Sequence, residues 1–314
     1  MTLLFWHKAQ RQTATFTLVV PYRTIRLMKT PRVLAIHDIS GVGRCSLTVA
    51  LPVLSAAGIE CSVLPTAVLS THTGEFEGYT FRDLSEDILP MAQHWKSLDL
   101  KFDAIYTGYL ASFEQVELIK QVINLLADDN TFIVVDPVMA DEGELYPGFS
   151  EDYPAQMRTL CARANLIVPN LTEAALLLGC DYDPNPNPDA VKSILRSLCT
   201  DIRAQSAVLT GVSFWSKDGS DSLGAASYDP KLPDIFYTGE ARASGMYHGS
   251  GDLFCSALLA GLLNGCSLEE ATKRAVNFTA ESVQRTFKAG TETKYGLLFE
   301  AGLAHFGAQF STME

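Results

Sequence analysis

The 314-residue sequence lacks the short patterns that mark the most familiar nucleotide-binding proteins. It contains no G-x-x-x-x-G-K-[ST] run, which argues against a P-loop nucleotide site. Gly41-Val-Gly43 resembles the start of a dinucleotide-binding turn, but Ser46 stands where the third glycine belongs. No acidic residue ends the next predicted strand, near Pro65, so a nicotinamide-dependent dehydrogenase is disfavoured as well.

Cysteines and long apolar runs are also scarce. The seven cysteines are odd in number, widely spaced and never arranged as C-x-x-C. This usage is typical of reduced thiols in a cytoplasm rather than of a disulfide framework or a zinc site. No apolar run reaches the length of a membrane span. We therefore expect a cytoplasmic protein that does not associate with a membrane.

Positively charged residues are scarce. The chain has 24 Lys and Arg but 36 Asp and Glu, so its net charge is −12. A nucleic-acid partner is not expected, since it requires a basic surface. The exception is residues 1–29, where the only charged side chains are Lys and Arg. Because Met28 directly precedes the first strand-like run, we expect residues 1–30 to be a peripheral or disordered extension. Residues 31–314 are then expected to form a single domain.

The most informative stretch is Gly249-Ser250-Gly251-Asp252, which is followed by an apolar run to Leu263 without proline or charge. The glycines allow a tight turn and a close approach of the backbone to a ligand, and the apolar run predicts a buried helix. Asp252 then lies in the first turn, beside free N–H groups at the positive end of the helix dipole. The stretch predicts an anion site that contains a carboxylate, and a simple helix cap is the alternative.

Strand-like and helix-like segments alternate along the rest of the chain. The last two predicted strands, joined by Asp229-Pro230, form an antiparallel pair at the sheet edge. The alternation predicts a three-layer, doubly wound α/β fold with a mainly parallel sheet flanked by helices. The predicted strands cover residues 32–37, 60–66, 102–106, 131–135, 165–168, 207–210, 223–228 and 234–238, and the predicted helices cover 46–57, 83–95, 112–126, 153–162, 170–179, 187–199, 252–263 and 268–285.

Polar side chains follow almost every predicted parallel strand. Ligands of doubly wound sheets bind beyond the carboxyl ends of the strands, where these side chains are expected to meet. The residues concerned are Asp38, His72, Thr73, Tyr109, Asp136, Asp141, Asn170, Glu173, Thr210 and Asp252.

Some of these polar residues have simpler interpretations. Asp136 and Asp141 suit an oxygen-ligand Mg²⁺ site, but they also suit an ordinary turn around a proline. Asn170 and Glu173 match a capping box and need do nothing more than start a helix. His72 has no second histidine beside it, so a hydrogen-bonding loop residue is a simpler interpretation than a metal ligand.

Seven short motifs occur in order between Arg32 and the C-terminal helix, at residues 36–43, 69–74, 107–109, 135–141, 168–173, 209–211 and 249–254. Together they resemble the ribokinase-like superfamily, and within it the pyridoxal kinases and hydroxymethylpyrimidine kinases. Thr71-His-Thr-Gly74 and Thr107-Gly-Tyr109 are similar to the pyridoxal kinase branch in particular.

This resemblance implies a homodimeric enzyme that uses ATP and Mg²⁺ to phosphorylate the 5′-hydroxymethyl group of pyridoxal, pyridoxine or pyridoxamine. It implies that Asp252 is the catalytic base and that Gly249, Ser250 and Gly251 hold the transferring phosphoryl group. A requirement for a monovalent cation such as K⁺ is left open. By the same resemblance Asp136, Asn170, Glu173, Thr210 and Gly211 bind the nucleotide, Asp136, Asp141 and Glu173 bind Mg²⁺, and Asp38, Ser40, His72, Thr73 and Tyr109 line the vitamer pocket.

Substrate choice is where the motifs diverge. Pyridoxal kinases commonly present a serine at the place of Asp38, and Asp38-Ile-Ser-Gly41 is closer to the hydroxymethylpyrimidine kinases. A hydroxymethylpyrimidine kinase or a dual-specificity enzyme is therefore the first alternative. A sugar or nucleoside kinase and a non-catalytic vitamer-binding protein are the others. His248, next to the glycine turn, either reaches the phosphates or faces solvent, and the helix N-terminus is expected to lower the pKa of Asp252.

Overall fold

The computed structural model describes residues 30–215, 221–243 and 245–310. The predicted extension at residues 1–30 therefore lies outside the described residues, apart from Thr30. Within the described ranges, one large sheet has nine strands in the order β11-β10-β9-β8-β5-β4-β1-β2-β3. These strands are β1 (Arg32–Ser40), β2 (Glu60–Leu69), β3 (Phe81–Asp83), β4 (Ala104–Thr107), β5 (Phe132–Val135), β8 (Leu166–Ile167), β9 (Ser206–Trp215), β10 (Asp221–Tyr228) and β11 (Phe236–Ala241).

The sheet is mainly parallel. The six strands from β2 to β9 in the spatial order all run in the same direction, so their carboxyl ends lie along one edge. The antiparallel pairings lie at the two sides of this sheet, where β3 pairs with β2 and β10 pairs with both β9 and β11. The predicted antiparallel pair at the sheet edge is confirmed, and it corresponds to β10 and β11.

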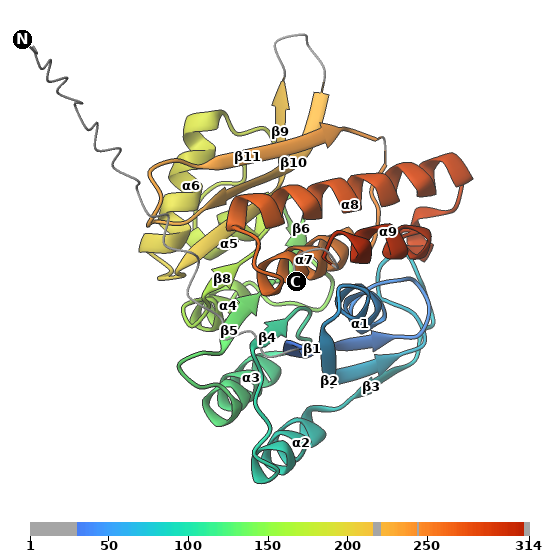
Figure 1. Ribbon diagram of the computed structural model, residues 1–314, viewed down its shortest axis with the longest axis vertical. Helices are drawn as coiled ribbons and strands as arrows, with labels where there is room; N and C mark the ends of the chain where they lie inside the picture. The colour runs from blue at the N-terminus through green and yellow to red at the C-terminus, as the bar shows by residue number, and fades with distance from the viewer. Residues whose placement is uncertain (1–29, 216–220, 244, 311–314) are drawn as a thin grey trace, which may run out of the picture.

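Helices cover both faces of the sheet, which confirms the three-layer architecture (Figure 1). Each face has its own buried apolar cluster, since successive side chains of a strand point to opposite faces. One face carries α1 (Leu47–Ala56), α7 (Ser250–Leu263), α8 (Leu268–Ala289) and α9 (Leu303–Ala308). The other carries α2 (Ser85–Ser97), α3 (Phe113–Leu126), α4 (Tyr153–Cys161), α5 (Leu171–Leu178) and α6 (Pro188–Thr200).

Local signals in the sequence predicted several helix ends correctly. The Asn170 side chain accepts from the Glu173 N–H, and the Glu173 side chain accepts from the Asn170 N–H, which completes the predicted capping box. Gly179 ends the same helix in the left-handed conformation. Asn187 caps α6 through the N–H groups of residues 189 and 190, with Pro188 at the first helical position.

The errors concern the ends of elements and three very short strands. β1 extends to Ser40, so Asp38 lies within the strand rather than in a turn after it. The edge strand β3 and the small hairpin of β6 (Ala140–Asp141) and β7 (Glu144–Leu145) were not predicted, because such short pairs have no periodicity to detect. The helix predicted at 83–95 occupies Ser85–Ser97. No helix within the described parts of the chain is both long and apolar enough to cross a membrane.

Candidate active site

The carboxyl edge of the sheet meets the N-terminus of α7. Gly249 caps α7 with a φ of 73°, which places Asp252 in the first turn as predicted. A Cβ at Gly249 would overlap the backbone carbonyl of Arg44, so only glycine allows this approach. The loop after β1 therefore lies directly on the glycine turn.

The Asp252 carboxylate is mostly buried, with 13 % of its side chain exposed. The Ser46 N–H donates to its Oδ2 at 2.8 Å, and Nδ1 of His37 lies 3.8 Å from its Oδ1. Burial, with a smaller contribution from the nearby Asp38, raises the pKa of Asp252 to about 7 against the opposing effect of the Ser46 hydrogen bond. The expectation that the helix N-terminus lowers this pKa is wrong, because the lost hydration of the carboxylate outweighs the helix dipole.

Asp38 is buried beside Asp252 and is held by two hydroxyl groups. Ser40 donates to its Oδ2 at 2.8 Å, and Ser46 donates to its Oδ1 at 2.5 Å. Burial raises the pKa of Asp38 despite these hydrogen bonds. Ser46 thus connects the two aspartates, with its N–H on Asp252 and its hydroxyl on Asp38.

The aromatic ring of Tyr109 lies near Asp38. Its ring packs against Phe149 with a centroid distance of 5.6 Å. Burial raises the pKa of Tyr109 to about 12, and Asp38 contributes to the increase. The phenol is therefore neutral at physiological pH, and it presents a flat, partly buried ring near the Asp38 carboxylate.

Three further carboxylates lie at the same edge of the sheet. Burial, with Glu173 and Asp252 nearby, raises the pKa of Asp136 well above its ordinary value. The pKa of Glu173 is raised to about 8, mainly by burial, although the Asn170 and Met139 N–H groups donate to its oxygens at 2.9 and 3.1 Å. Asp141 is half-buried, and burial raises its pKa as well.

These carboxylates do not form a complete metal site by themselves. Within residues 30–215, 221–243 and 245–310, no three His, Cys, Asp or Glu side chains are arranged to hold a metal ion. The two Glu173 oxygens are already occupied by backbone donors. Asp136 is different, since its buried carboxylate receives no hydrogen bond from the described residues.

Asn170 and Thr210 are brought together by a parallel β-bridge just past the end of β8. Thr210 lies within β9 rather than after a strand that ends there, as the sequence predicted, because β9 continues along β10 to Trp215. The Thr210 N–H donates to the Pro169 carbonyl at 3.0 Å, and Gly211 follows with a φ of 73°. The Asn170 amide donates to the Ala140 carbonyl at 2.8 Å. The segments after β5 and β8 are thereby connected to each other and to β9.

The structure gives His72 a role in holding its loop. The Gly74 N–H donates to Nδ1 at 3.1 Å, so the proton lies on Nε2, which donates to the Lys294 carbonyl at 2.6 Å. Both ring nitrogens are occupied, and Thr73 points its exposed side chain to solvent without a hydrogen bond in the described residues. His248 pairs with Glu75 at 3.0 Å and packs on the His72 ring at a centroid distance of 4.8 Å.

Three residues of this site were missed from the sequence. Ser46 and His37 contact Asp252 from sequence positions more than 200 residues away. Tyr146 follows β7, and burial together with Glu173, Asp141 and Asp136 raises its pKa. Each of these residues reaches the site through contacts between segments that are far apart in the sequence, so no local sequence pattern predicts them.

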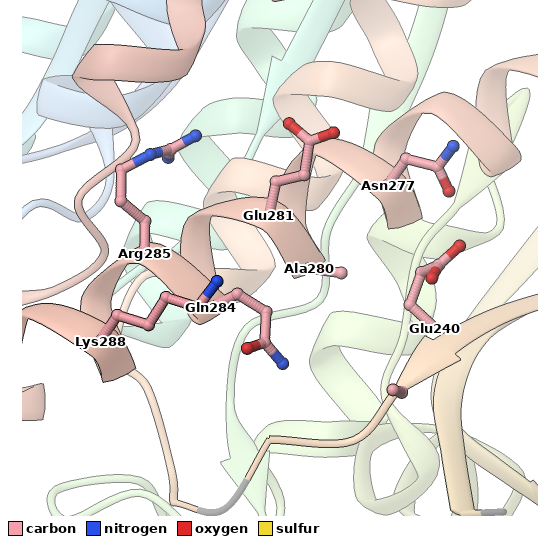
Figure 2. Close-up of a pocket in the computed structure, with 8 residues that line it drawn as sticks. Glu240, Asn277, Ala280, Glu281, Gln284, Arg285 and Lys288 are labelled. Atoms are coloured by element: carbon pink, nitrogen blue, oxygen red, sulfur yellow. The ribbon is translucent and has the colours of Figure 1, made fainter.

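A groove of about 700 Å³ lies between β11 and α8. Figure 2 shows that Glu240 borders it from β11, whereas the side chains from Asn277 to Lys288 line it from α8. Thr238 pairs with Ala225, which pairs in turn with Thr210. Because β11 runs parallel to β9, Glu240 lies beyond the level of Thr210, toward the carboxyl edge.

Comparisons with known proteins agree on one family. Residues 51–296 match the model of the phosphomethylpyrimidine kinase family. A structure from Bacteroides thetaiotaomicron, described as a candidate phosphomethylpyrimidine kinase and determined with pyridoxal, is 35 % identical with a TM-score of 0.82. The alignment covers 88 % of this chain and 96 % of that one.

Two further relatives are described as kinases of B6 vitamers. The pyridoxal kinase from Lactobacillus plantarum is 33 % identical, with a TM-score of 0.79 over 89 % of this chain and 97 % of the other. The pyridoxine/pyridoxal/pyridoxamine kinase from Bordetella avium is 29 % identical over 271 residues, which cover 78 % of this chain and 81 % of the relative. The predicted resemblance is therefore confirmed at the level of the family.

Proposed function

Because the chain belongs to the phosphomethylpyrimidine kinase family, we propose that it phosphorylates the 5′-hydroxymethyl group of pyridoxal, pyridoxine or pyridoxamine with ATP. Such an enzyme returns B6 vitamers to their 5′-phosphates, and pyridoxal gives pyridoxal 5′-phosphate directly. The proposal is supported by the similarity to vitamer kinases and by the pyridoxal complex of a 35 % identical protein. The observation that carries it is the position of Asp252 in the first turn of α7, with the Asp38 carboxylate and, beside it, the Tyr109 ring nearby.

The proposed reaction needs few groups from the protein. The hydroxymethyl oxygen attacks the γ-phosphorus while its proton passes to Asp252, and the bond between the γ-phosphorus and the β–γ bridging oxygen breaks to release ADP. The N–H groups at the start of α7 face the transferring phosphoryl group and stabilise its charge. Asp252, mostly buried and held by Ser46, is an oriented proton acceptor.

The residues present fit a role for Mg²⁺. Asp136 offers a buried carboxylate without a hydrogen-bond donor from the described residues, and Mg²⁺ commonly binds one or two carboxylates together with phosphates and water. We propose that Asp136 holds the ion, with Asp141 and Glu173 acting through water or by orienting the loop. When bound, Mg²⁺ neutralises charge on the phosphates.

We also propose a place for each end of ATP. Thr210 and Gly211 lie at the carboxyl edge between Asn170 and the hairpin of β10 and β11, on the path from the glycine turn to the groove. The groove along α8 is large enough for a nucleoside and is lined by Asn277, Ala280 and Gln284. The base is proposed to bind there, with the phosphates directed toward α7.

The alternative function is a hydroxymethylpyrimidine kinase or an enzyme that accepts both rings. It is favoured by Asp38, since the pocket presents a buried carboxylate where a serine is common in the vitamer kinases. The deciding experiment is ATP consumption with pyridoxal, pyridoxamine, pyridoxine and hydroxymethylpyrimidine at matched concentrations. We expect turnover of at least one vitamer; efficient turnover of the pyrimidine alone would reject the leading proposal.

Activity is expected to depend on pH through Asp252. Its carboxylate form accepts the proton, and a pKa of about 7 means that this form is lost as the pH falls below neutrality. kcat/KM, which reports the free enzyme, should fall about tenfold per pH unit below about pH 7. A profile that stays flat to pH 5.5 would contradict the raised pKa.

Asp38→Ser is expected to change the preference between pyridine and pyrimidine substrates by about tenfold or more. The substitution removes the acceptor of the Ser40 and Ser46 hydroxyls and the charge near Tyr109. The measurement is the ratio of kcat/KM for pyridoxal to that for hydroxymethylpyrimidine. An unchanged ratio would place Asp38 outside substrate recognition.

We further propose that the protein is a homodimer, in line with its resemblance to dimeric kinases. The edge strand β3 has an open hydrogen-bonding side, and the apolar side chains Val68 and Phe81 near it are 41 % and 43 % exposed. Light scattering is expected to give about twice the chain mass of 34.2 kDa. A mass of one chain at micromolar concentration would reject the dimer.

A further inference from the structure

His37 is a buried histidine that the resemblance gives no role. It lies in β1, with no exposed surface, and its ring packs edge-on against Tyr106 at a centroid distance of 4.4 Å. A Cβ at Gly108 would overlap the His37 ring, so the chain after β4 passes close beside it. The ring is thus confined by β4 and the residue directly after it, and its Nδ1 side lies near Asp252 in the first turn of α7.

The polar atoms of His37 have no partner among the described residues. Neither Nδ1 nor Nε2 has a hydrogen bond there. Leaving a buried donor or acceptor without a partner is costly, and such groups in native proteins call for a specific explanation. Oδ1 of Asp252 lies 3.8 Å from Nδ1, and the other oxygen of that carboxylate already accepts from Ser46.

We propose that His37 is a positioning residue for Asp252, whose Nδ1–H donates a hydrogen bond to Oδ1 in the substrate-bound enzyme. The inference rests on the proposed function. The separation of 3.8 Å is too long for a hydrogen bond. Catalytic hydrogen bonds are often long without substrate and shorten in the reactive complex.

The chemistry of a neutral imidazole suits this role. Burial lowers the pKa of His37 to about 3, so the ring carries one proton and no charge at physiological pH. A neutral Nδ1–H donor favours the carboxylate form of Asp252 without neutralising it as a base. With Ser46 on Oδ2 and His37 on Oδ1, both oxygens of Asp252 are oriented before the proton arrives.

The other titratable groups near this pair come from several elements. Asp38 precedes the loop that carries Cys45, Tyr106 lies on β4, and Cys255 lies on α7. Asp136 and Tyr146 approach from the loops after β5 and β7. Burial raises the pKa of each. Among the described residues, Asp252 has the carboxylate that lies within 4 Å of a His37 nitrogen, so the removal of His37 is expected to act mainly on Asp252.

Two substitutions at His37 test the inference by steady-state kinetics across pH. His37→Leu removes the donor and keeps an apolar side chain, so kcat near pH 7 should fall about tenfold. The acidic limb of the kcat profile should move upward by about one pH unit, so that activity partly recovers at pH 9. His37→Asn places an amide N–H near the position of Nδ1 and should restore most of the activity and the wild-type limb.

Other kinetic outcomes would overturn the inference. Equal losses in both variants at every pH would indicate a structural role, and an unchanged profile in His37→Leu would indicate no role. Melting temperatures of the two variants, measured in parallel, show whether the kinetic comparison involves folded proteins.

A second measurement does not depend on enzymatic activity. NMR of the wild-type chain labelled with ¹⁵N-histidine, assigned with the His37→Asn spectrum, reports which nitrogen carries the proton. The Nδ1–H tautomer is expected, and the Nε2–H tautomer would overturn the inference even if His37→Leu does not fold. Absence of turnover by the wild-type enzyme on every substrate would instead defeat the proposed function, and the tautomer would still decide the role of His37.

Discussion

Asp252→Asn is expected to lower kcat by about 10²-fold or more while the fold and ATP binding persist. The amide keeps the shape of the side chain in the first turn of α7 but accepts a proton far more weakly. Its oxygen can still accept from the Ser46 N–H, which donates to Oδ2 of Asp252 at 2.8 Å. The measurement is steady-state turnover with the preferred substrate, together with nucleotide affinity by calorimetry.

Asp189→Asn is a matched control for this prediction. Asp189 also lies in the first turn of a helix, α6, but its side chain is 94 % exposed to solvent. The control should retain normal turnover. Near-normal kcat in Asp252→Asn would remove Asp252 from the role of base, and loss of nucleotide affinity would indicate that the charge serves binding instead.

Gly249→Ala is expected to cost both activity and stability. A Cβ there meets the Arg44 carbonyl, and the left-handed φ of 73° is strained for any residue with a Cβ. The conformation alone should lower the free energy of unfolding by about 1–2 kcal/mol. A shift of the turn by about 1 Å would misplace Asp252 and the N–H groups of α7, so kcat should fall about 10²-fold.

Gly251→Ala separates the turn from a general effect of losing a glycine. Nothing lies within 4 Å of a Cβ built at Gly251, and this position is already helical. Its melting temperature should equal or exceed that of the wild type, because alanine is favoured over glycine in a helix. Equal destabilisation of both variants would show that the contact between Gly249 and Arg44 has no special importance.

Local sequence patterns predicted the frame of the protein well. Apolar runs such as Phe132–Val135 form buried strands wherever they fall in the chain, because burial on both faces demands them. The capping box at Asn170 and the helix start at Gly249 were also predictable, because each involves residues within a few positions of one another.

The arrangement within the site was only partly predictable. The order of the strands implied that Asp38, Asp136 and Asp252 approach one edge, and the structure brings them close enough to influence one another's pKa values. The sequence pattern could not show that Ser46 hydrogen-bonds to both Asp38 and Asp252, because Ser46 and Asp252 are 206 residues apart in the chain. It also could not show that the backbone occupies both nitrogens of His72.

The sequence by itself determined the α/β frame, the buried helix and the presence of an acid at its start, because these depend on periodicity and local capping. Only the tertiary structure decided how that acid behaves. Packing of the β1 loop, β4 and α7 around Asp252 removes water from its carboxylate, and this desolvation raises the pKa to about 7 against the helix dipole. How deeply the Asp252 carboxylate is buried depends on contacts between segments that are far apart in the sequence, so no single stretch of sequence predicts it.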